Sequence, residues 1–533
     1  MKRNIWLLVI CFAVAMSLPW LVKGTSLLAL VALVPLLWAE RMADRAHIKR
    51  FWPYHYAGFV LWNAATTFWI WNATAGGAVF AILANALQMS LIFGLYRLSK
   101  KALSGPLPYI FLAAMWIAWE RWYLTSAQIS WPWLVMGNAF AKDISLVQWY
   151  EATGHLGGSA WVWACNLGIF GLLSALSDGR WKGFNIKAKT AAITALALVI
   201  LCPIAISEWR YASYSETEDP LDVLIAQPNI DPYNKFGGWT QDKQNAFLEG
   251  QIRQATRNRR DSSALLILAP ETFTSDIVVG EVESGKTFRR LSSLCADIPG
   301  SNLLFGATTF EYLGGANAPS RTARSIGKGM WYESHNSALI TDGSGRHDIF
   351  HKSKLVVGVE MTPYPAVFVP LDNMLGGVMG RDVGQKEISC LDFRAAGRDF
   401  PVGAAVCYES VYGEYCTGYV RKGARLLCVI TNDAWWGNTP GYRQHLSYSS
   451  LRAIETRRDI ARCGNTGISA IIDQRGRILS STPWWEPATL QGSVNLSDKE
   501  TFFVRNGDIV GRICTLVFLL LLLIVPVRLL RKE

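Results

Sequence analysis

The sequence is poor in charged side chains and has no cysteine pair at a metal-binding spacing. Only 17% of its 533 residues are charged, while 51% are hydrophobic, which is too apolar for an ordinary soluble protein of this length. The 10 cysteines include no Cys-x-x-Cys pair and no Cys/His spacing suited to zinc, which argues against a structural metal site. No low-complexity tract and no solenoid repeat is visible, so neither a disordered nor a repeat protein is expected.

The positive charge is not gathered into one basic stripe. The net charge is +11, but many lysines and arginines lie in short loops between apolar segments. We therefore expect no nucleic-acid partner. The excess of lysine and arginine is better explained by the orientation of membrane helices, whose loops carry these residues. The 23 tryptophans agree with this interpretation, since tryptophan favours membrane–water interfaces.

Eight apolar segments are candidate transmembrane helices, which need about 20 mostly apolar residues. They cover residues 4–22, 24–39, 54–73, 77–97, 107–122, 159–177, 190–206 and 511–528. The first segment follows Met-Lys-Arg like a signal peptide, but a second apolar segment comes at once, so we expect a retained anchor. An even number of spans places both termini on the same side of the membrane.

The short loops give the orientation. Loops 40–53, 98–106 and 178–189 and the C-terminal tail are rich in lysine and arginine, whereas 72–77 has neither. By the positive-inside rule the basic loops and both termini are cytoplasmic. The long hydrophilic block from about 207 to 508 is then extracytoplasmic.

That block has the pattern of an α/β domain. Short runs rich in Val, Ile or Leu and bounded by Gly, Pro, Asn or Asp predict buried strands. Segments 240–259 and 443–458 have helical character. The order predicts layered sheets with helices outside. The strand candidates are residues 221–227, 264–269, 302–307, 337–341, 402–406, 426–431 and 469–473.

Three apolar runs in the block each end in one ionisable residue: Glu271, Lys352 or Cys407. A thiol at the end of a buried strand is well placed as a nucleophile, because the next backbone N–H groups can stabilise an oxyanion. A partly buried carboxylate is a suitable general base, and a lysine cation can lower a thiol pKa. An acid, an amine and a thiol in this setting predict covalent catalysis.

Each of the three residues also has a structural interpretation. Cys407 could be a packing residue, and Glu271 could be an acid at a helix N-terminus after Pro270. Lys352 could lie on the surface, with Lys354, two residues on, as its competitor for the catalytic role. The combination of all three favours the catalytic interpretation.

Other polar and aromatic residues are assigned to structure or substrate contact. His445 is interpreted as a hydrogen-bonded structural histidine, and Arg452 with Glu455 as a pair on one helix. Trp131 and Trp133 either line a lipid entrance or anchor the chain at the interface. Asn432, Asp433 and Trp435 are expected to shape the floor of the site.

The segment from 364 to 379, which includes Tyr364 and Phe368, is unusually apolar for an exposed loop. Gly376 and Gly377 offer a hinge. We hypothesise a lid that dips into the membrane and excludes water, so that serine at Val367 and Phe368 would slow the reaction. The alternative is a loop that packs on the core.

With these residues in place, the chain resembles the nitrilase, or carbon–nitrogen hydrolase, superfamily with its Glu-Lys-Cys triad, and more narrowly the membrane-bound apolipoprotein N-acyltransferases of bacteria. The similarity rests on Ala-Gln-Pro-Asn-Ile at 226–230, Thr-Asn-Asp-Ala-Trp-Trp-Gly at 431–437, Arg-Ala-Ile-Glu at 452–455, Asn-Thr-Gly-Ile-Ser at 465–469 and Trp-Pro-Trp-Leu at 131–134. The last of these resembles a motif of the membrane domain, so the likeness extends to both parts of the chain.

The resemblance implies a polytopic α-helical membrane domain of about eight spans plus an extracytoplasmic α/β nitrilase-like domain, an αββα sandwich. The expected boundaries are 1–210 for the transmembrane domain, 218–500 for the catalytic domain and 509–530 for a last transmembrane helix. The location implied is the bacterial inner membrane, with the catalytic domain on the periplasmic side. A monomer without a cofactor is expected.

The resemblance also implies a ping-pong acyl transfer. Cys407 attacks an ester of a membrane phospholipid and forms a thioester, and the α-amine of a diacylglyceryl-modified lipoprotein cysteine then takes the acyl chain. Glu271 is implied as the general base, and Lys352 with the backbone N–H of Tyr408 as the oxyanion site. Glu360 and Glu409 match two further family glutamates, interpreted as carboxylates that organise the site.

Three departures from the family pattern concern substrate contacts. Where the family often has Pro-Phe-Gly-Glu, this chain has Val-Gly-Val-Glu360, and Ala269 stands where tryptophan is frequent. A family tryptophan after the first strand corresponds to Phe236 or Trp239.

Two alternatives to an acyltransferase remain open. A membrane-tethered amidase or nitrilase-type hydrolase would share the triad and differ in using water as the acceptor. A catalytically inert lipid-binding scaffold or transporter is the other, although the predicted spans contain few acids or bases for an ion-coupled pathway.

Overall fold

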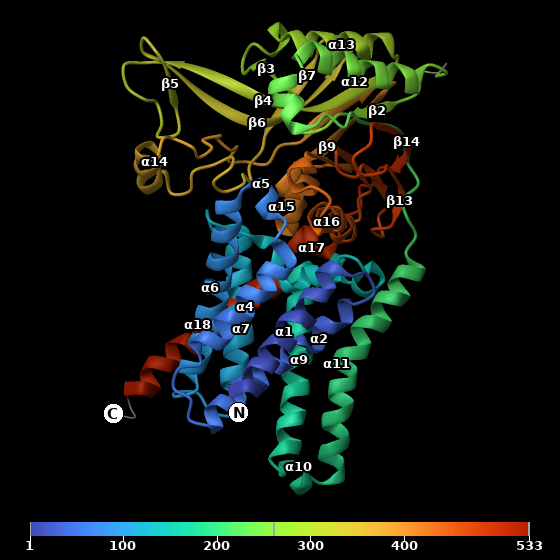
Figure 1. Cartoon of the computed structure of the whole chain (residues 1–533). Coiled ribbons are helices and arrows are strands. Elements are labelled where there is room, and N and C mark those ends of the chain that lie inside the picture. The colour runs from blue at the N-terminus through green and yellow to red at the C-terminus, as the bar shows by residue number, and fades with distance from the viewer. Residues whose placement is uncertain (1, 260–261, 531–533) are drawn as a thin grey trace.

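The computed structural model describes residues 2–259 and 262–530. It has a helical part and an α/β part that sits on one end of it (Figure 1). The helical part is built of α1 Lys2–Leu21, α2 Ala29–Ala32, α3 Val34–Arg45, α4 Trp52–Thr67, α5 Ile70–Ala73, α6 Ala75–Ser99, α7 Leu107–Thr125, α8 Tyr150–Thr153, α9 His155–Ser177, α10 Arg180–Gly183, α11 Ile186–Ser213, α17 Phe502–Asn506 and α18 Ile509–Leu530.

Six stretches of the described residues are long and apolar enough to cross a membrane: Lys2–Leu21, Ser26–Arg45, Ala75–Ser99, His155–Ser177, Ile186–Ser213 and Ile509–Arg528. The chain is therefore a membrane protein with several apolar helices. The other two predicted spans coincide with α4, of 16 residues, and α7, of 19 residues. The count of eight spans stays a prediction.

The α/β part contains two sheets. Among the described residues, one sheet has the order β14-β1-β2-β4-β6-β5, with β3 on β4 and β7 on β6, and the other the order β13-β12-β11-β10-β9-β8. The first comprises β1 Pro220–Gln227, β2 Leu265–Leu268, β3 Thr274–Val278, β4 Ser301–Gly314, β5 Arg324–Gly327, β6 Met330–Asp342, β7 His347–His351 and β14 Ala488–Asn495. The second comprises β8 Leu391–Ala395, β9 Arg398–Val406, β10 Leu426–Thr431, β11 Ile460–Gly464, β12 Ala470–Ile472 and β13 Ile478–Ser481.

The sheets are packed face to face, as the alternating side chains of β1 show. Leu221, Val223 and Ile225 enter the apolar cluster shared with β9 and β10 of the second sheet, while Leu224 and Ala226 enter the cluster shared with the helices on the outer face. Side chains alternate along a strand, so a strand covered on both faces is apolar throughout. The predicted layered α/β architecture is confirmed, and each of the seven predicted strand segments is a strand.

The helices complete the layers. They are α12 Gln241–Thr256, α13 Lys286–Asp297, α14 Pro365–Met374, α15 Gly413–Arg421 and α16 Pro440–Thr456. Helices α12 and α13 cover the first sheet, and α15 and α16 lie between the second sheet and the helical part (Figure 1). The core of the helical part continues into this second layer, because Tyr408, Val411, Tyr448, Leu451 and Ile454 belong to the same buried cluster as the apolar helices.

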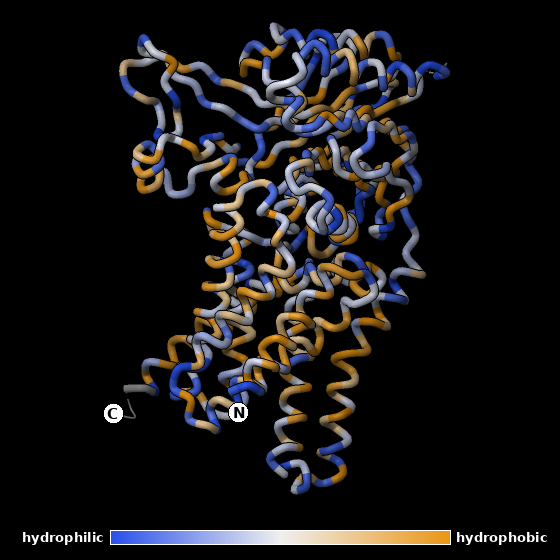
Figure 2. Tube along the Cα trace, in the orientation of Figure 1, coloured by the Kyte–Doolittle hydropathy of each residue, from blue (hydrophilic) through white to orange (hydrophobic). Residues whose placement is uncertain are grey.

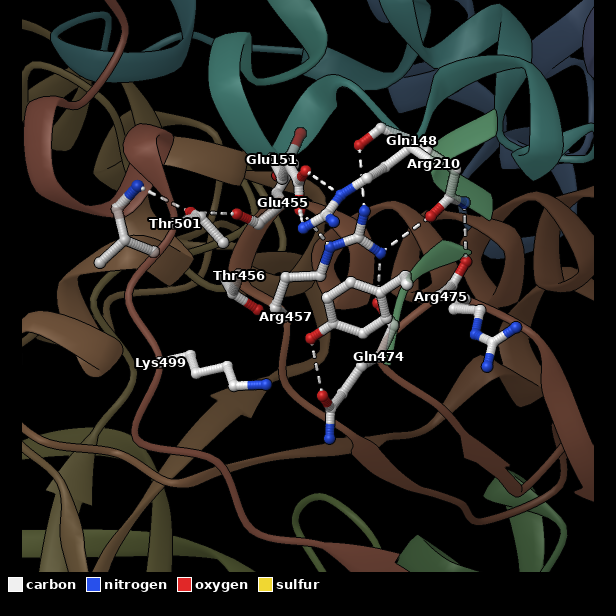
Figure 3. A network of polar contacts seen from close by, with 12 residues as sticks. Gln148, Glu151, Arg210, Glu455, Thr456, Arg457, Gln474, Arg475, Lys499 and Thr501 are labelled. Carbon is white, nitrogen blue, oxygen red and sulfur yellow. Dashed lines mark hydrogen bonds and ion pairs between the residues drawn. The ribbon is translucent and has the colours of Figure 1, made fainter. Parts of the chain in front are cut away.

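A buried polar network also joins the two parts (Figure 3). Arg457, at the end of α16, donates from Nε to Glu151 Oε2 at 2.6 Å and from Nη1 to Gln148 Oε1 at 2.8 Å. The same Nη1 lies 2.9 Å from the carbonyl oxygen of Gln474, and the guanidinium covers the ring of Tyr214 at 4.3 Å. Arg457 therefore connects α8 and the residues just before it with the α/β part.

Replacing Glu151 with alanine is expected to destabilise the protein by about 3 kcal/mol or more, because it leaves the buried Arg457 cation without its carboxylate. The measurement is unfolding of the full chain in detergent. The matched control is Asp297→Ala, which breaks an Arg253–Asp297 pair whose side chains are 51% and 52% exposed and should cost no more than about 1 kcal/mol. Equal effects of the two variants would contradict a role of the network in holding the parts together.

Candidate active site

The fold brings the three predicted ionisable residues together at the ends of strands. Glu271 follows β2, Lys352 directly follows β7, and Cys407 directly follows β9. Lys352 Nζ lies 3.1 Å from Glu271 Oε1, and the charges of Glu271 and Lys352 both act on the Cys407 thiol. Because the strands come from both sheets, the site lies where the two sheets meet.

The carboxylate of Glu271 is held at both oxygens. Oε1 accepts from Lys352 Nζ and, at 2.8 Å, from Asn336 Nδ2. Oε2 accepts from the backbone N–H of Asn432 at 3.0 Å. The side chain is almost fully buried, so its orientation is fixed before a substrate arrives, which general-base catalysis requires.

Lys352 is a buried cation between two carboxylates. Its Nζ lies 2.8 Å from Glu360 Oε1, in addition to Glu271. Burial disfavours the charged amine, yet Glu271 and Glu360 raise the pKa of Lys352 well above its usual value. Lys354, by contrast, extends over the rings of Tyr412 and Tyr415 at 5.3 and 5.8 Å.

Cys407 stands on a strained turn. Its φ is +50°, a left-handed conformation that side chains other than glycine rarely adopt. Its carbonyl oxygen accepts from Ser410 Oγ at 2.7 Å and lies 3.1 Å from His445 Nε2. These contacts hold the turn, so that the chain reverses at the thiol and enters the 3₁₀ helix Cys407–Val411.

Cys407 is a neutral thiol at rest. Burial raises the pKa of Cys407 well above its usual value, the charge of Glu271 raises it further, and Lys352 opposes both. A neutral thiol is a poor nucleophile, so any reaction at this sulfur needs a base to remove its proton.

The two further predicted carboxylates have different partners. Glu360 contacts Lys352, Asn336 Nδ2 at 2.8 Å and the backbone N–H of Val356 at 2.7 Å. Glu409 accepts from the backbone N–H groups of Ser353 at 2.6 Å, Lys354 at 3.2 Å and Val406 at 2.9 Å, and from the hydroxyls of Tyr415 and Tyr419. Glu409 therefore joins the Lys352 segment to the Cys407 turn.

Replacing Glu409 with glutamine is expected to slow covalent modification of Cys407 about 100-fold, because an amide N–H group placed against backbone donors displaces the Cys407 turn from the Lys352 segment. Tyr415→Phe, which removes only one of the five donors, should lose much less. The rate of covalent modification of Cys407 by a substrate is the measurement. A Glu409→Gln enzyme as fast as Tyr415→Phe would show that the carboxylate has no such function.

His445 is a satisfied structural histidine, as the sequence predicted. Nδ1 lies 2.9 Å from Asp433 Oδ1, and Nε2 lies 2.9 Å from Ser410 Oγ. Cys407, Asp433 and His445 present ligand-type atoms within 4.8 Å of one another. Asp433 is already paired with Arg462 at 2.7 Å, so we interpret this group as the support of the nucleophile turn. Arg452 and Glu455 form the predicted helical pair at 2.8 Å.

The predicted substrate residues lie on three separate segments of the described chain. Tyr364 donates its backbone N–H to Gln128 of the helical part at 2.7 Å, and Phe368 is half-buried on α14. Trp435 is 40% exposed in the 3₁₀ helix Asp433–Trp436. Trp239 packs against Phe247 and Lys243 of α12. The side chain of its alternative, Phe236, lies outside the described part of the structure.

Two tryptophans before α8 lie beneath the nucleophile. Trp133 is buried and donates to Gln444 Oε1 at 2.7 Å. Trp131 stacks on Trp133 at 5.3 Å and on Tyr408 at 6.2 Å. Interfacial anchoring of Trp133 is therefore wrong, because the α/β part covers it.

Asn336 is the site residue that the sequence analysis missed. Its Nδ2 donates to both Glu271 and Glu360, and its own backbone carbonyl accepts from Lys352 N at 2.8 Å. The signal was an amide at the start of the apolar run 337–341 of a buried strand, where a polar side chain needs partners.

Two family models match the chain. The model described as carbon–nitrogen hydrolase matches residues 225–502, and the model described as apolipoprotein N-acyltransferase N-terminal domain matches residues 12–168. Three relatives named apolipoprotein N-acyltransferase cover most of it. The relative from Chlorobaculum tepidum is 27% identical, and the match covers 94% of this chain and 92% of the relative. The relative from Geobacter metallireducens is 28% identical, with 96% of this chain and 93% of the relative covered. The relative from Gloeobacter violaceus is 26% identical, with 91% of this chain and 87% of the relative covered.

Proposed function

Because the chain belongs to the carbon–nitrogen hydrolase family, whose model covers more than half of it, we propose that it is an apolipoprotein N-acyltransferase. It moves an acyl chain from a membrane phospholipid, through a thioester on Cys407, to the α-amine of the diacylglyceryl-cysteine of a lipoprotein. Relatives of that name along almost the whole chain support this. The observation that carries the mechanism is the convergence of Glu271, Lys352 and Cys407 next to the apolar helices.

The first half-reaction transfers the acyl group to sulfur. Glu271 takes the thiol proton as Cys407 Sγ attacks the ester carbonyl carbon. The oxyanion that forms is stabilised by the Lys352 cation and the backbone N–H of Tyr408. When the intermediate collapses, the C–O bond breaks, the leaving alkoxide takes the proton from Glu271, and a lysophospholipid departs.

The second half-reaction uses the same groups. The α-amine of the lipoprotein cysteine attacks the thioester carbonyl, and Glu271 takes a proton from the nitrogen. Collapse breaks the C–S bond, forms the amide and returns the proton to sulfur. Glu360 and Glu409 hold Lys352 and the nucleophile turn in position throughout.

Transfer competes with hydrolysis, so the thioester must be shielded from water. The predicted apolar lid is a helix rather than a loop: α14 follows Tyr364 and starts with Pro365. It exposes Val367 (57%), Leu371 (47%) and Met374 (83%). Figure 2 shows this hydrophobic segment at the edge of the α/β part that faces the apolar helices. Gly376 and Gly377 after it both have positive φ, which supports their function as a hinge.

Serine at both Val367 and Leu371 is expected to slow acylation from phospholipid vesicles about tenfold, because the exposed face of α14 loses apolar area that would enter the bilayer. Acylation from a short-chain phospholipid dissolved in detergent should change little. Leu479→Ser, at an exposed position of β13, is the matched control. Unchanged rates with vesicles would show that α14 is not a membrane-dipping lid.

The finer topology is part of the proposal. Eight spans, with α4 and α7 added to the six long apolar helices, place both termini in the cytoplasm and the catalytic domain in the periplasm. The lysines and arginines of loops 40–53, 98–106 and 178–189 support this orientation. We assign residues 1–210 to the transmembrane domain, 218–500 to the catalytic domain and 509–530 to the last helix. The enzyme is a monomer of the bacterial inner membrane.

The experiment that tests the function is intact mass after mixing purified enzyme with phospholipid vesicles. We expect a gain of one acyl chain that hydroxylamine removes, together with a lysophospholipid product. A diacylglyceryl-cysteinyl peptide added next should take up the chain as an amide. Release of free fatty acid instead of acylated peptide would identify a hydrolase, and the absence of both adduct and lysophospholipid would exclude phospholipid as the donor.

A further inference from the structure

The hairpin of α9 and α11 has an unusually large uncovered apolar surface. Only 6% of the apolar stretch of α11 is buried, against 50% for α9. The two helices run side by side to α10, at the end of the molecule farthest from the α/β part (Figure 1). Most of their length is hydrophobic, and polar residues gather at the α10 end (Figure 2).

A groove of about 440 Å³ lies between these helices, within the size range of small-molecule sites. Small residues of both helices form much of its lining, namely Ala164, Gly168, Gly171, Ala192 and Ala195. A side chain at Gly171 would meet no atom within 4 Å, so the space beside it is open. A groove with apolar walls on a membrane-spanning hairpin suits a hydrocarbon chain.

The α10 end of the groove is basic. Arg180 and Trp181 line it. Asp178 pairs with three arginines, namely Arg180 and, from α3, Arg41 and Arg45. One carboxylate neutralises only one of three guanidinium groups, so the cluster keeps a positive charge. The rest of loop 178–189 adds Lys182, Lys187 and Lys189 and no second acid.

We propose that the α9–α11 groove binds one anionic phospholipid. An acyl chain lies between the two helices beside Gly171, where the space is open, and the phosphate pairs with Arg180 and the neighbouring arginines. Guanidinium groups form paired hydrogen bonds with phosphate, and Trp181 stands at the depth where tryptophan meets head groups.

This lipid is not the acyl donor. Cys407 lies in the α/β part, whereas Arg180 stands at the opposite end of the hairpin (Figure 1). The bound lipid instead fills the groove between α9 and α11. A zwitterionic phospholipid has the same phosphate but also an ammonium group, which the arginine cluster repels, so the charge at the α10 end favours an anionic head group. A second copy of the chain would bring further lysines and arginines to this end.

The test uses full-length protein in vesicles of phosphatidylethanolamine with a minor share of phosphatidylglycerol that carries a photoreactive acyl chain. After irradiation, labelled peptides are mapped, and acylation of Cys407 is measured in the same sample. We expect label on α9 and α11. Gly171→Leu should lower it at least about tenfold, a change of about 1.4 kcal/mol, because leucine fills the groove without meeting a neighbouring atom at Cβ. Gly94→Leu on α6, where a Cβ also meets nothing within 4 Å, should keep it.

Charge selectivity gives an independent readout. Arg180→Gln should weaken labelling by phosphatidylglycerol, and the same photoreactive chain on phosphatidylethanolamine should label wild type weakly. Equal labelling of wild type and Gly171→Leu, equal labelling by both lipids, or cross-links between two protein chains at the hairpin would each overturn the proposal. Acylation of Cys407 reports separately on the proposed function, because the groove variants leave the catalytic residues intact.

Discussion

Replacing Cys407 with alanine is expected to abolish the acyl-enzyme and to lower N-acylation of a diacylglyceryl-cysteinyl peptide at least about 10⁴-fold, as loss of a nucleophile does in other covalent enzymes. The fold should remain intact, because the carbonyl of residue 407 still holds the turn through Ser410 and His445. Intact mass and the rate of peptide acylation are the two measurements.

The matched control for the nucleophile is Cys416→Ala. Cys416 is also buried and lies nearby on α15, where its thiol contacts the carbonyl oxygen of Glu409 at 3.6 Å. It has no contact with Glu271 or Lys352 among those the structure describes. This variant should still form the hydroxylamine-labile adduct. An adduct that persists in Cys407→Ala and disappears in Cys416→Ala would refute the assignment.

Replacing Lys352 with methionine is expected to slow thioester formation about 10³-fold, because the oxyanion loses its cation. The change also leaves Glu271 and Glu360 facing each other without the ammonium group that both contact. Burial and the charge of Glu271 both raise the pKa of Glu360, and without the ammonium group nothing of comparable strength opposes them. Glu360 then takes up a proton more readily, which disturbs its hydrogen bond with Asn336 and adds to the loss.

Loss of Lys352 should also change how the activity depends on pH. Burial already raises the pKa of Glu360, and Lys352 opposes that rise. Without the lysine Glu360 ionises only at higher pH, so the residual activity of Lys352→Met should increase toward alkaline pH over a range where wild type is flat. Lys354→Met, two residues on, should keep the wild-type rate and profile. A reversed order of the two variants would make Lys354 the catalytic lysine.

The sequence was sufficient for the layers of the α/β part and for the three residues at strand ends. Apolar runs bounded by turn residues mark strands buried on both faces, and β2 and β9 are of this kind. Strand β11 was missed because it contains Arg462, which is buried only because Asp433 neutralises it from another strand end. Exposed strands such as β13 carry no apolar pattern to detect.

Partners distant in sequence explain the other omissions. Asn336 contacts Glu271, 65 positions away, and Glu360, 24 positions away, so its place on a buried strand shows that it needs partners but not which residues they are. The hydrogen bonds of Glu409 likewise exist only because the fold brings the loop after β7 next to the end of β9. For α14 a local signal did exist, since proline at the first position of a helix is favourable, but the lid was interpreted as a loop.

The buried cluster that runs from the apolar helices into the α/β part has a practical consequence for expression. Tyr408, Val411, Tyr448, Leu451 and Ile454 are buried against the helices, and the first two belong to the 3₁₀ helix that starts at Cys407. In a truncated chain that starts at β1 and stops before α17, these side chains would form one apolar surface exposed to solvent. We expect such a fragment to precipitate or to require detergent, so the α/β part should be expressed together with the apolar helices.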